Sequence, residues 1–208
     1  MFEFDLMHIV ASLPGLILAF ALHEYAHARV AVSLGDPTPR LMGRLTVNPI
    51  SHIDPIGLLV LFLVQFGWAK PVIYNPYNFK DFKKGTVLVA LAGPGANLVI
   101  SFVALLIYAL LSKYGMLTSA GIIDVLTFIV IININFAVFN MLPLPPLDGS
   151  RVVSSFLSGE LAEKYQLIER YSFIIFIVLI MTPIFSYIIR PIASAILQIF
   201  SVIINILV

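Results

Sequence analysis

The chain has 208 residues, of which 60% are hydrophobic and 11% charged, and its formal net charge is +1. A soluble domain carries roughly 25% charged residues, so this composition excludes a soluble globular protein and indicates a membrane protein. No run of Lys or Arg indicates binding to nucleic acid, and the absence of cysteine excludes disulfides and thiolate metal sites. Any metal ion must therefore be bound by His, Asp, Glu or backbone oxygen atoms.

Five apolar segments are predicted to form membrane-spanning helices. Such a helix needs about 20 mostly apolar residues, because the hydrocarbon core is roughly 30 Å thick. The segments are 9–33, 86–112, 121–142, 166–189 and 191–207, with Pro191 placed in the first turn of the last. A further apolar segment, 58–68, has only about half the spanning length, and we expect a re-entrant piece there.

The region between the first two spans has a different pattern. Residues 40–79 contain four prolines and short β-prone pieces at 45–47 and 71–74, which predict small membrane-associated strands joined by turns. We therefore expect an all-α polytopic membrane protein with about five transmembrane helices, a short re-entrant segment and small β strands. Residues 1–208 are predicted to form one domain, with its core at about 9–157 and C-terminal helices at about 166–208.

The distribution of Lys and Arg predicts the orientation in the membrane. Ten of these 12 residues lie before the second span or after the third, and only Lys113 and Arg190 fall on the other side. Since Lys and Arg are enriched in cytoplasmic connections, we expect these regions to be cytoplasmic and the N-terminus to lie outside. The N-terminal residues lack the positive region of a signal peptide, so the first helix should be retained.

The motif His23-Glu24-Tyr25-Ala26-His27 lies in the first predicted span. Residues four apart share one face of a helix, so both imidazoles can bind one metal ion. Glu24, one position on, can accept a proton from a water molecule. Ionisable side chains within a span are costly and usually mark function. The alternative is a chance match, in which the histidines pair with polar groups on other helices.

A catalytic zinc ion takes three protein ligands, so a third must come from elsewhere in the chain. Asp148 follows the third span, where three prolines within 143–146 end the helix and Gly149 permits a turn or a close approach. Such a broken helix beside a span is a common place for an ion site. Two other interpretations remain open: Asp148 can be the N-cap of the segment 150–157, or a downstream Glu can be the ligand. The candidates for that Glu are Glu160, Glu163 and Glu169.

Together with these two motifs, three others resemble the site-2 protease family of intramembrane zinc metallopeptidases. The matching segments, in the family's order over most of residues 15–155, are His23-Glu24-x-x-His27, Asn48-Pro49-x-x-His52-x-Asp54-Pro55-x-Gly57, Gly67-Trp68-Ala69-Lys70-Pro71-Val72, Gly93-Pro94-x-Ala96-Asn97 and Asn140-x-x-Pro143…Leu147-Asp148-Gly149. No segment corresponds to a PDZ domain or a nucleotide-binding module, so the chain resembles a minimal form of the family.

The resemblance implies one Zn²⁺ per chain, bound by His23, His27 and Asp148. It implies that Glu24 is the catalytic acid/base and that Asn140 orients the substrate or stabilises the tetrahedral intermediate. The implied activity is hydrolysis of peptide bonds within or near transmembrane helices of single-span proteins, in a prokaryotic cytoplasmic membrane. Because the first helix runs from outside to inside, the site and the cut should lie toward the cytoplasmic half of the bilayer.

A peptide bond in a helix is protected by hydrogen bonds, so we expect the substrate to unwind and pair with 41–50 or 70–76. His52 and Asn97 are candidate substrate contacts. A loop histidine such as His52 is more often satisfied by backbone, and Asn97 can equally form a structural interhelical bond. The principal alternative function is a transporter or a metal- or proton-binding membrane protein with the histidines in its path. A non-catalytic relative that binds membrane helices is a third possibility. The pattern does not indicate an oligomeric state.

Overall fold

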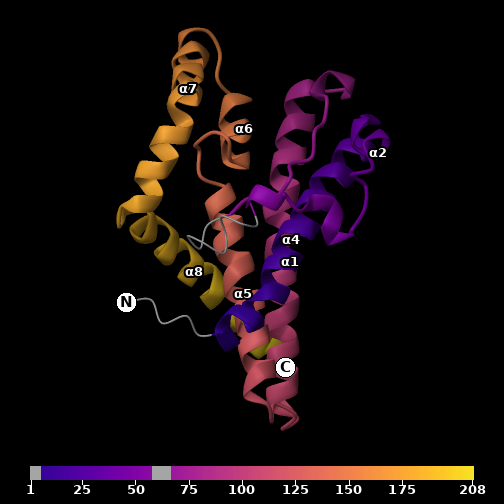
Figure 1. The fold of residues 1–208 in the computed structure, drawn as a ribbon, viewed down its shortest axis with the longest axis vertical. Coiled ribbons are helices and arrows are strands. Elements are labelled where there is room, and N and C mark those ends of the chain that lie inside the picture. Colours follow the sequence, from indigo (N-terminus) through magenta and orange to yellow (C-terminus); the bar gives the residue numbers. More distant parts are fainter. Residues whose placement is uncertain (1–5, 58–66) are drawn as a thin grey trace.

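The computed structural model describes residues 6–57 and 67–208, and every regular element within these ranges is a helix (Figure 1). The long helices are α1 (Leu6–Ser33), α4 (Phe82–Lys113), α5 (Ala120–Asn140), α7 (Glu160–Met181) and α8 (Ile184–Leu207). The short ones are α2 (Thr38–Leu41), α6 (Asp148–Ser154) and the 3₁₀ turns η1 (Pro49–His52) and η2 (Pro76–Asn78). This confirms the all-α class that the composition predicts.

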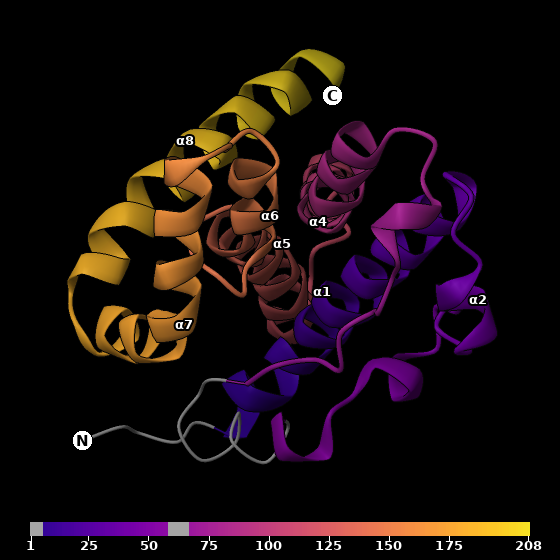
Figure 2. The ribbon, with the colours of Figure 1, turned by 90° about the horizontal axis from the view of Figure 1, so that it is seen from above.

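Helices α1, α4 and α5 pack against one another at the centre of the molecule, and α6 lies over the end of α5 (Figure 2). The buried face of α1 consists largely of small residues, among them Gly15, Ala19 and Ala28. A Cβ atom at Gly15 would lie 3.1 Å from the backbone oxygen of Phe128 in α5. Small residues let membrane helices approach closely, and this packing is what holds them together in lipid.

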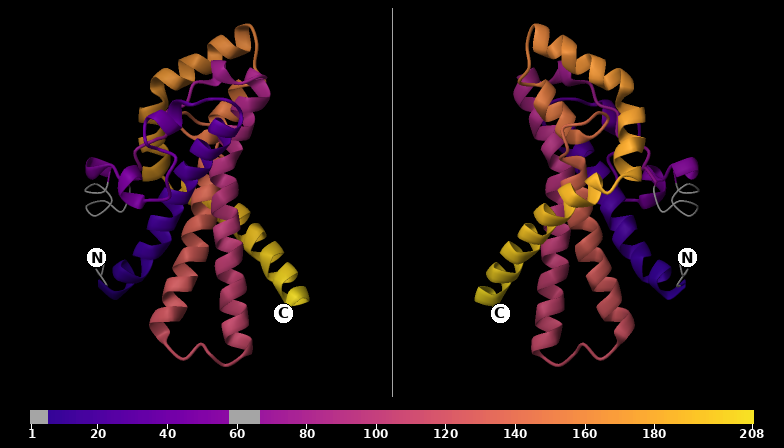
Figure 3. Two further views of the ribbon diagram at one scale, coloured as in Figure 1. Left: turned by 90° about the vertical axis from the view of Figure 1, so that its right-hand side faces the viewer. Right: turned by 90° about the vertical axis from the view of Figure 1, so that its left-hand side faces the viewer.

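Helix α8 packs across α5 and α4 and completes the apolar core. Ile189 of α8 meets a cluster of buried residues from the two central helices, which are Ala104, Val130, Ile134 and Val138. The end of α8 lies on the side of the molecule that also holds the start of α1 and the α4–α5 connection (Figure 3). Helix α6 and the start of α7 lie at the opposite end, so α7 and α8 together cross the molecule once.

Four helices in the described residues are long and apolar enough to span a membrane: α1, α4, α5 and residues 186–207 of α8. The predicted span at 166–189 is not among them. It falls largely in α7, whose first half carries five charged residues, and α7 ends at Met181 because the chain turns before Pro183. Pro191 lies inside α8 and not in its first turn.

The predicted strands at 45–47 and 71–74 are wrong. These segments are not strands, and nearby, within the residues that the structure describes, an isolated antiparallel bridge joins Ile53 and Ala69. Pro71 has no N–H, and the N–H of Val72 donates to a carboxylate and not to a neighbouring strand. The predicted re-entrant segment 58–68 lies outside the described residues, apart from its last two.

The connection between α1 and α4 is fastened to the end of α1 by the carboxylate of Asp36, which is 0% exposed. Asp36 accepts hydrogen bonds from the N–H and hydroxyl of Thr38, the N–H of Asn75 and the side chain of Asn78, at 2.6–3.1 Å. Burial alone would raise the pKa of this carboxyl, but the donated hydrogen bonds hold it below its ordinary value. Asp36 therefore fixes the loop that passes beside the candidate site.

Candidate metal centre and active site

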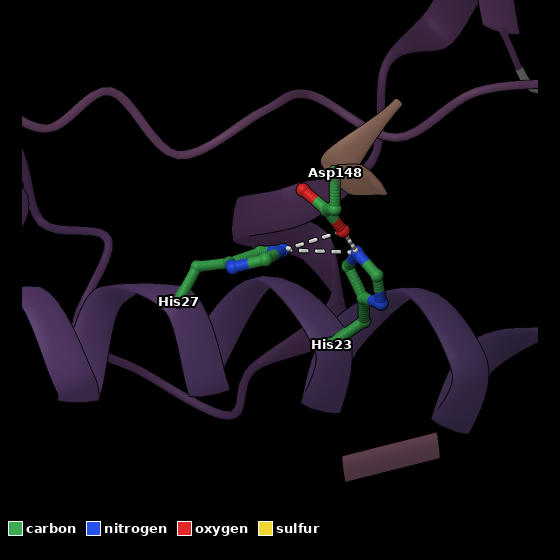
Figure 4. Close-up of side chains that lie close together, drawn as sticks. All are labelled: His23, His27 and Asp148. Carbon is green, nitrogen blue, oxygen red and sulfur yellow. Dashed lines mark hydrogen bonds and ion pairs between the residues drawn. The ribbon is translucent and has the colours of Figure 1, made fainter. Parts of the chain in front are cut away.

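Three side chains from two distant parts of the chain meet beside α1 (Figure 4). His23 and His27 lie one turn apart on α1, and Asp148 is the first residue of α6. The Oδ2 atom of Asp148 lies 3.1 Å from Nε2 of His23 and 3.2 Å from Nε2 of His27. The two Nε2 atoms are 3.0 Å apart. The structure thus brings together the three residues that the resemblance implies as zinc ligands.

The outer nitrogen of each imidazole is held by a fixed hydrogen-bond acceptor. Nδ1 of His27 lies 2.7 Å from the backbone oxygen of Val89 in α4. Because a carbonyl oxygen only accepts, Nδ1 of His27 carries the proton. In the neutral imidazole Nε2 then presents a lone pair toward Asp148.

The tautomer of His23 is determined by two asparagines. Oδ1 of Asn97 lies 2.7 Å from Nδ1 of His23, while Nδ2 of Asn97 donates to the backbone oxygen of Ala19 and to Asn133. Asn133 in turn donates to the backbone oxygen of Ile129, which fixes the direction of both amides. Nδ1 of His23 is therefore the donor, and its Nε2 also presents a lone pair.

Two imidazole lone pairs and a carboxylate oxygen consequently face one another within 3.2 Å. These groups repel unless a cation or a proton lies between them, and Oδ2 of Asp148 is buried without a hydrogen-bond partner in the described residues. The three residues form a group whose ligand atoms lie within 4.8 Å of one another, as a metal ion requires. Two neutral imidazoles and a carboxylate are a donor set that suits zinc and leaves a position for water. The residues therefore fit a zinc ion.

Two further residues shape the space around the imidazoles. Gly93 of α4 faces them so closely that a Cβ atom would lie 2.4 Å from Nε2 of His27 and 2.7 Å from Nε2 of His23. Any side chain there would collide with the two nitrogens that would bind the metal. The ring of Phe136 in α5 packs edge-on against His23, with ring centroids 5.0 Å apart. Neither role was predicted from the sequence, although Gly93 belongs to a motif that the resemblance includes.

Glu24 is partly buried, and its Oε2 accepts a 2.8 Å hydrogen bond from the backbone N–H of Val72. The catalytic candidate thus contacts the segment 69–75, which crosses beside α1. Asn140 is the last residue of α5 and is 8% exposed, with one N–H of its amide donated to the backbone oxygen of Phe136 at 2.9 Å. The second N–H of that amide is the group with which Asn140 can act on a substrate.

The other candidates are not part of the metal-binding group in the described residues. His52 is 1% exposed in η1, and its Nε2 lies 2.8 Å from the backbone oxygen of Thr46. Asn97 is 0% exposed and holds His23 from behind, which is the interhelical bond left open as its alternative role. The acids proposed as alternative ligands lie on α7, and the metal-binding group in the described residues contains Asp148 and none of them.

A metal site of this composition with Glu24 on the same helix, which is long enough to span a membrane, is the arrangement that an integral membrane zinc metalloprotease needs, and the comparisons with known proteins show this class. The model of peptidase family M50 matches residues 110–183, which include Asn140 and Asp148. The chain belongs to this family, the site-2 protease family. It is 40% identical to one relative, and the match covers 90% of that relative's length.

That relative is the "Putative zinc metalloprotease YwhC" of Bacillus subtilis, matched over 196 residues and 90% of this chain. The chain is 30% identical over 176 residues to the "Putative zinc metalloprotease Rip2" of Mycolicibacterium smegmatis, covering 82% of this chain and 66% of that one. It is 35% identical over 155 residues to the "Putative zinc metalloprotease MJ0611" of Methanocaldococcus jannaschii, covering 73% of each. No solved structure matches the chain.

Proposed function

We propose that this metalloprotease hydrolyses peptide bonds within or near the transmembrane helices of other membrane proteins. The observation that carries the proposal is the position of the site: His23 and His27 lie within α1, a helix of spanning length, and are 4% and 7% exposed. A peptide bond can reach them only at membrane depth. The partners are therefore the lipid bilayer and membrane protein substrates with a single span, and not nucleic acid.

The distribution of positive charge supports an orientation in which the start of α1 lies outside a prokaryotic cytoplasmic membrane. Arg29, Arg40 and Arg44 follow the histidines in the chain, so His23 and His27 occupy the cytoplasmic half of α1. Relatives from two bacteria and an archaeon fit a prokaryotic membrane. Cleavage should then fall in the cytoplasmic half of the substrate helix.

In the proposed reaction, His23, His27 and Asp148 hold one Zn²⁺ per chain, and Glu24 and Asn140 act on the substrate. When bound, the ion supplies Lewis-acid activation of water and of the scissile carbonyl. Glu24 accepts the proton of the attacking water and passes it to the leaving nitrogen. The second N–H of the Asn140 amide donates to the developing oxyanion, a type of contact that contributes roughly 3–4 kcal/mol elsewhere.

The substrate must expose a peptide bond that a helix normally protects. We infer that substrates carry helix-weakening residues near the cut and that the unwound segment pairs with residues 70–76, where Val72 contacts Glu24. Main-chain hydrogen bonds to such a stretch satisfy backbone groups that would otherwise be unpaired in lipid. Residues 41–50 offer a second place for this pairing.

The proposal is tested by measuring zinc content and cleavage together on purified protein, with a single-span substrate in detergent. Wild type should hold about one zinc per chain and cleave the substrate, whereas Asp148→Ala should lose both, because two imidazoles alone leave the site one ligand short. Glu163→Ala, which removes an exposed acid on α7, is the matched control and should keep both properties.

Each other outcome has a definite meaning. Zinc and cleavage that persist in Asp148→Ala but disappear in Glu163→Ala would move the third ligand to α7. Wild type that binds zinc but leaves every single-span substrate intact would refute the proposed substrate class. Cleavage in wild type with a cut mapped by mass spectrometry to a loop far from the membrane would refute the proposed depth of the site.

A further inference from the structure

The backbone N–H of Val72 and the carboxylate of Glu24 form a hydrogen bond between residues 48 positions apart in the chain. We propose that the amide of Val72 is a positioning group for the reaction: it holds Oε2 of Glu24 so that the other carboxylate oxygen faces the attacking water. This inference rests on the proposed role of Glu24 in peptide hydrolysis. It adds a residue that acts through its backbone N–H, which any residue except proline would provide.

Glu24 needs such a partner because its side chain is long and rotatable. A general base works only when its oxygen lies within hydrogen-bond reach of the proton that it takes, and small misplacements are costly. In the described residues, the bond from Val72 is the hydrogen bond that fixes this carboxylate. A bond to a charged acceptor is roughly twice as strong as one between neutral groups. Val72 is 9% exposed, so water competes little for its N–H.

The segment that carries Val72 is itself fixed on both sides. Two residues earlier, the N–H of Lys70 donates to the backbone oxygen of His52 at 2.8 Å. Three residues later, the N–H of Asn75 donates to the buried carboxylate of Asp36 at 2.7 Å. A stretch held so closely at both ends cannot follow a rotating Glu24 side chain. His52 and Asp36 thus support Glu24 indirectly, through the backbone between them.

The competing interpretation is that the bond merely fastens the loop to α1. The two roles predict different kinetics. A bond that only holds the loop would alter stability or substrate binding, whereas a bond that orients the general base would alter the chemical step. The discriminating change must remove the N–H while leaving the side chain of Val72 in place.

An amide-to-ester substitution at residue 72, with the hydroxy-acid analogue of valine introduced by nonsense suppression, makes this change. We expect kcat to fall about 10- to 100-fold, as for a misplaced catalytic group, with KM within about twofold and zinc retained. Affinity for a hydroxamate inhibitor, which binds zinc and shares a proton with the general base, should fall as well. The hydroxamate measurement reports the position of Glu24 independently of turnover.

Two controls complete the design. The same ester at Lys80, an exposed residue of the same connection, should leave kcat and hydroxamate affinity at their wild-type values. Val72→Ala keeps the N–H and removes the side chain, so its loss of kcat should be smaller than that of the ester.

Unchanged kcat and hydroxamate affinity in the residue 72 ester would overturn the proposal. So would loss of zinc or a rise in KM alone, since either would show that the bond holds the loop. A wild type that cleaves no single-span substrate would refute the proposed function, and the hydroxamate affinity of the residue 72 ester would still decide this inference.

Discussion

Asn97 accepts a 2.7 Å hydrogen bond from Nδ1 of His23, and this contact decides which nitrogen of the imidazole faces Asp148. Asn97 cannot turn its amide around, because its Nδ2 donates to the backbone oxygen of Ala19 at 3.0 Å. The asparagine thus keeps Nε2 of His23 free of a proton and ready to bind a metal ion. From the sequence, Asn97 is either a substrate contact or an interhelical hydrogen bond. In the structure it supports the metal centre by orienting His23.

Asn97→Ala should weaken zinc binding by about 10- to 100-fold, the usual effect of removing a group that orients a metal-binding histidine. Without the acceptor, the ring of His23 can rotate and can carry its proton on either nitrogen. The measurement is a competition titration with a chelator of known zinc affinity, on protein purified in detergent.

Ser101→Ala is the matched control for Asn97→Ala. Ser101 lies one turn further along α4, is 0% exposed and donates to the backbone oxygen of Val130 at 3.1 Å. Its loss should lower the free energy of unfolding by about 1 kcal/mol, as for a typical buried hydrogen bond, and should leave zinc affinity unchanged. Equal losses of zinc affinity in both variants would show that helix packing, and not the bond to His23, sets the affinity.

Gly93→Ala should abolish zinc binding, because the added Cβ would lie 2.4 Å from Nε2 of His27. The methyl group would occupy space that the metal and its ligands need, and α4 cannot retreat while it is packed against α1. Zinc content by mass spectrometry measures the effect.

Gly95→Ala is the control for Gly93→Ala, since a Cβ at Gly95 has no atom within 4 Å among the described residues. This variant should bind zinc as wild type does and gain slightly in helix stability, by up to about 1 kcal/mol. If Gly93→Ala retained its zinc, the conclusion that α4 lies too close to the imidazoles to admit a side chain at Gly93 would be refuted.

The sequence predicts those parts of this site that are carried by side chains. Two histidines with helical spacing point to a metal by themselves, and Asp148 is added by its motif. The supports for Nδ1 of His27 and Oε2 of Glu24 are backbone groups of Val89 and Val72. Valine carries no signal for either role, since any residue other than proline offers the same N–H and C=O.

The errors in the predicted fold have a related cause. β-Prone residues at 71–74 indicated a strand, but the N–H of Val72 bonds to Glu24 of another element, which no local pattern reveals. Hydropathy over 166–189 indicated a span, yet α7 begins six residues earlier with charged residues and ends before Pro183. For a long, strongly apolar helix such as α5, the span predicted from the sequence agrees with the structure, because length and hydropathy alone define such a helix.

Glu24→Gln should keep zinc and lower kcat by about 10²- to 10⁴-fold, the usual contribution of a general base. The amide oxygen of glutamine can still accept the hydrogen bond from Val72, so the side chain keeps its position while losing its ability to take a proton. Single-turnover cleavage and zinc content on the same sample measure both effects. Glu163→Gln, the same change on the exposed face of α7, should cleave as wild type does; a comparable loss there would point to a general effect of charge.

Asp36→Asn should destabilise the protein near neutral pH, by about 1–3 kcal/mol, because an amide replaces a buried carboxylate that accepts several hydrogen bonds. The pKa of Asp36 is lower in the folded protein than its ordinary value, so its ionised form contributes stability above the unfolded pKa of about 3.9. That contribution is lost as pH falls through the lower folded pKa.

The difference in stability between wild type and Asp36→Asn should therefore be full at pH 7 and shrink below about pH 4. Unfolding midpoints in detergent at pH 7, 5 and 3 measure it.

Asp81→Asn is the control: Asp81 is exposed and caps α4 through one hydrogen bond, from the N–H of Lys84, so its loss should cost only about 1 kcal/mol. A difference for Asp36→Asn that stayed constant down to pH 3 would mean that the contribution of Asp36 does not depend on its charge. Zinc affinity should stay near wild type in both variants, because neither carboxylate contacts the imidazoles, and turnover should fall only in Asp36→Asn, through the loosened segment beside Glu24.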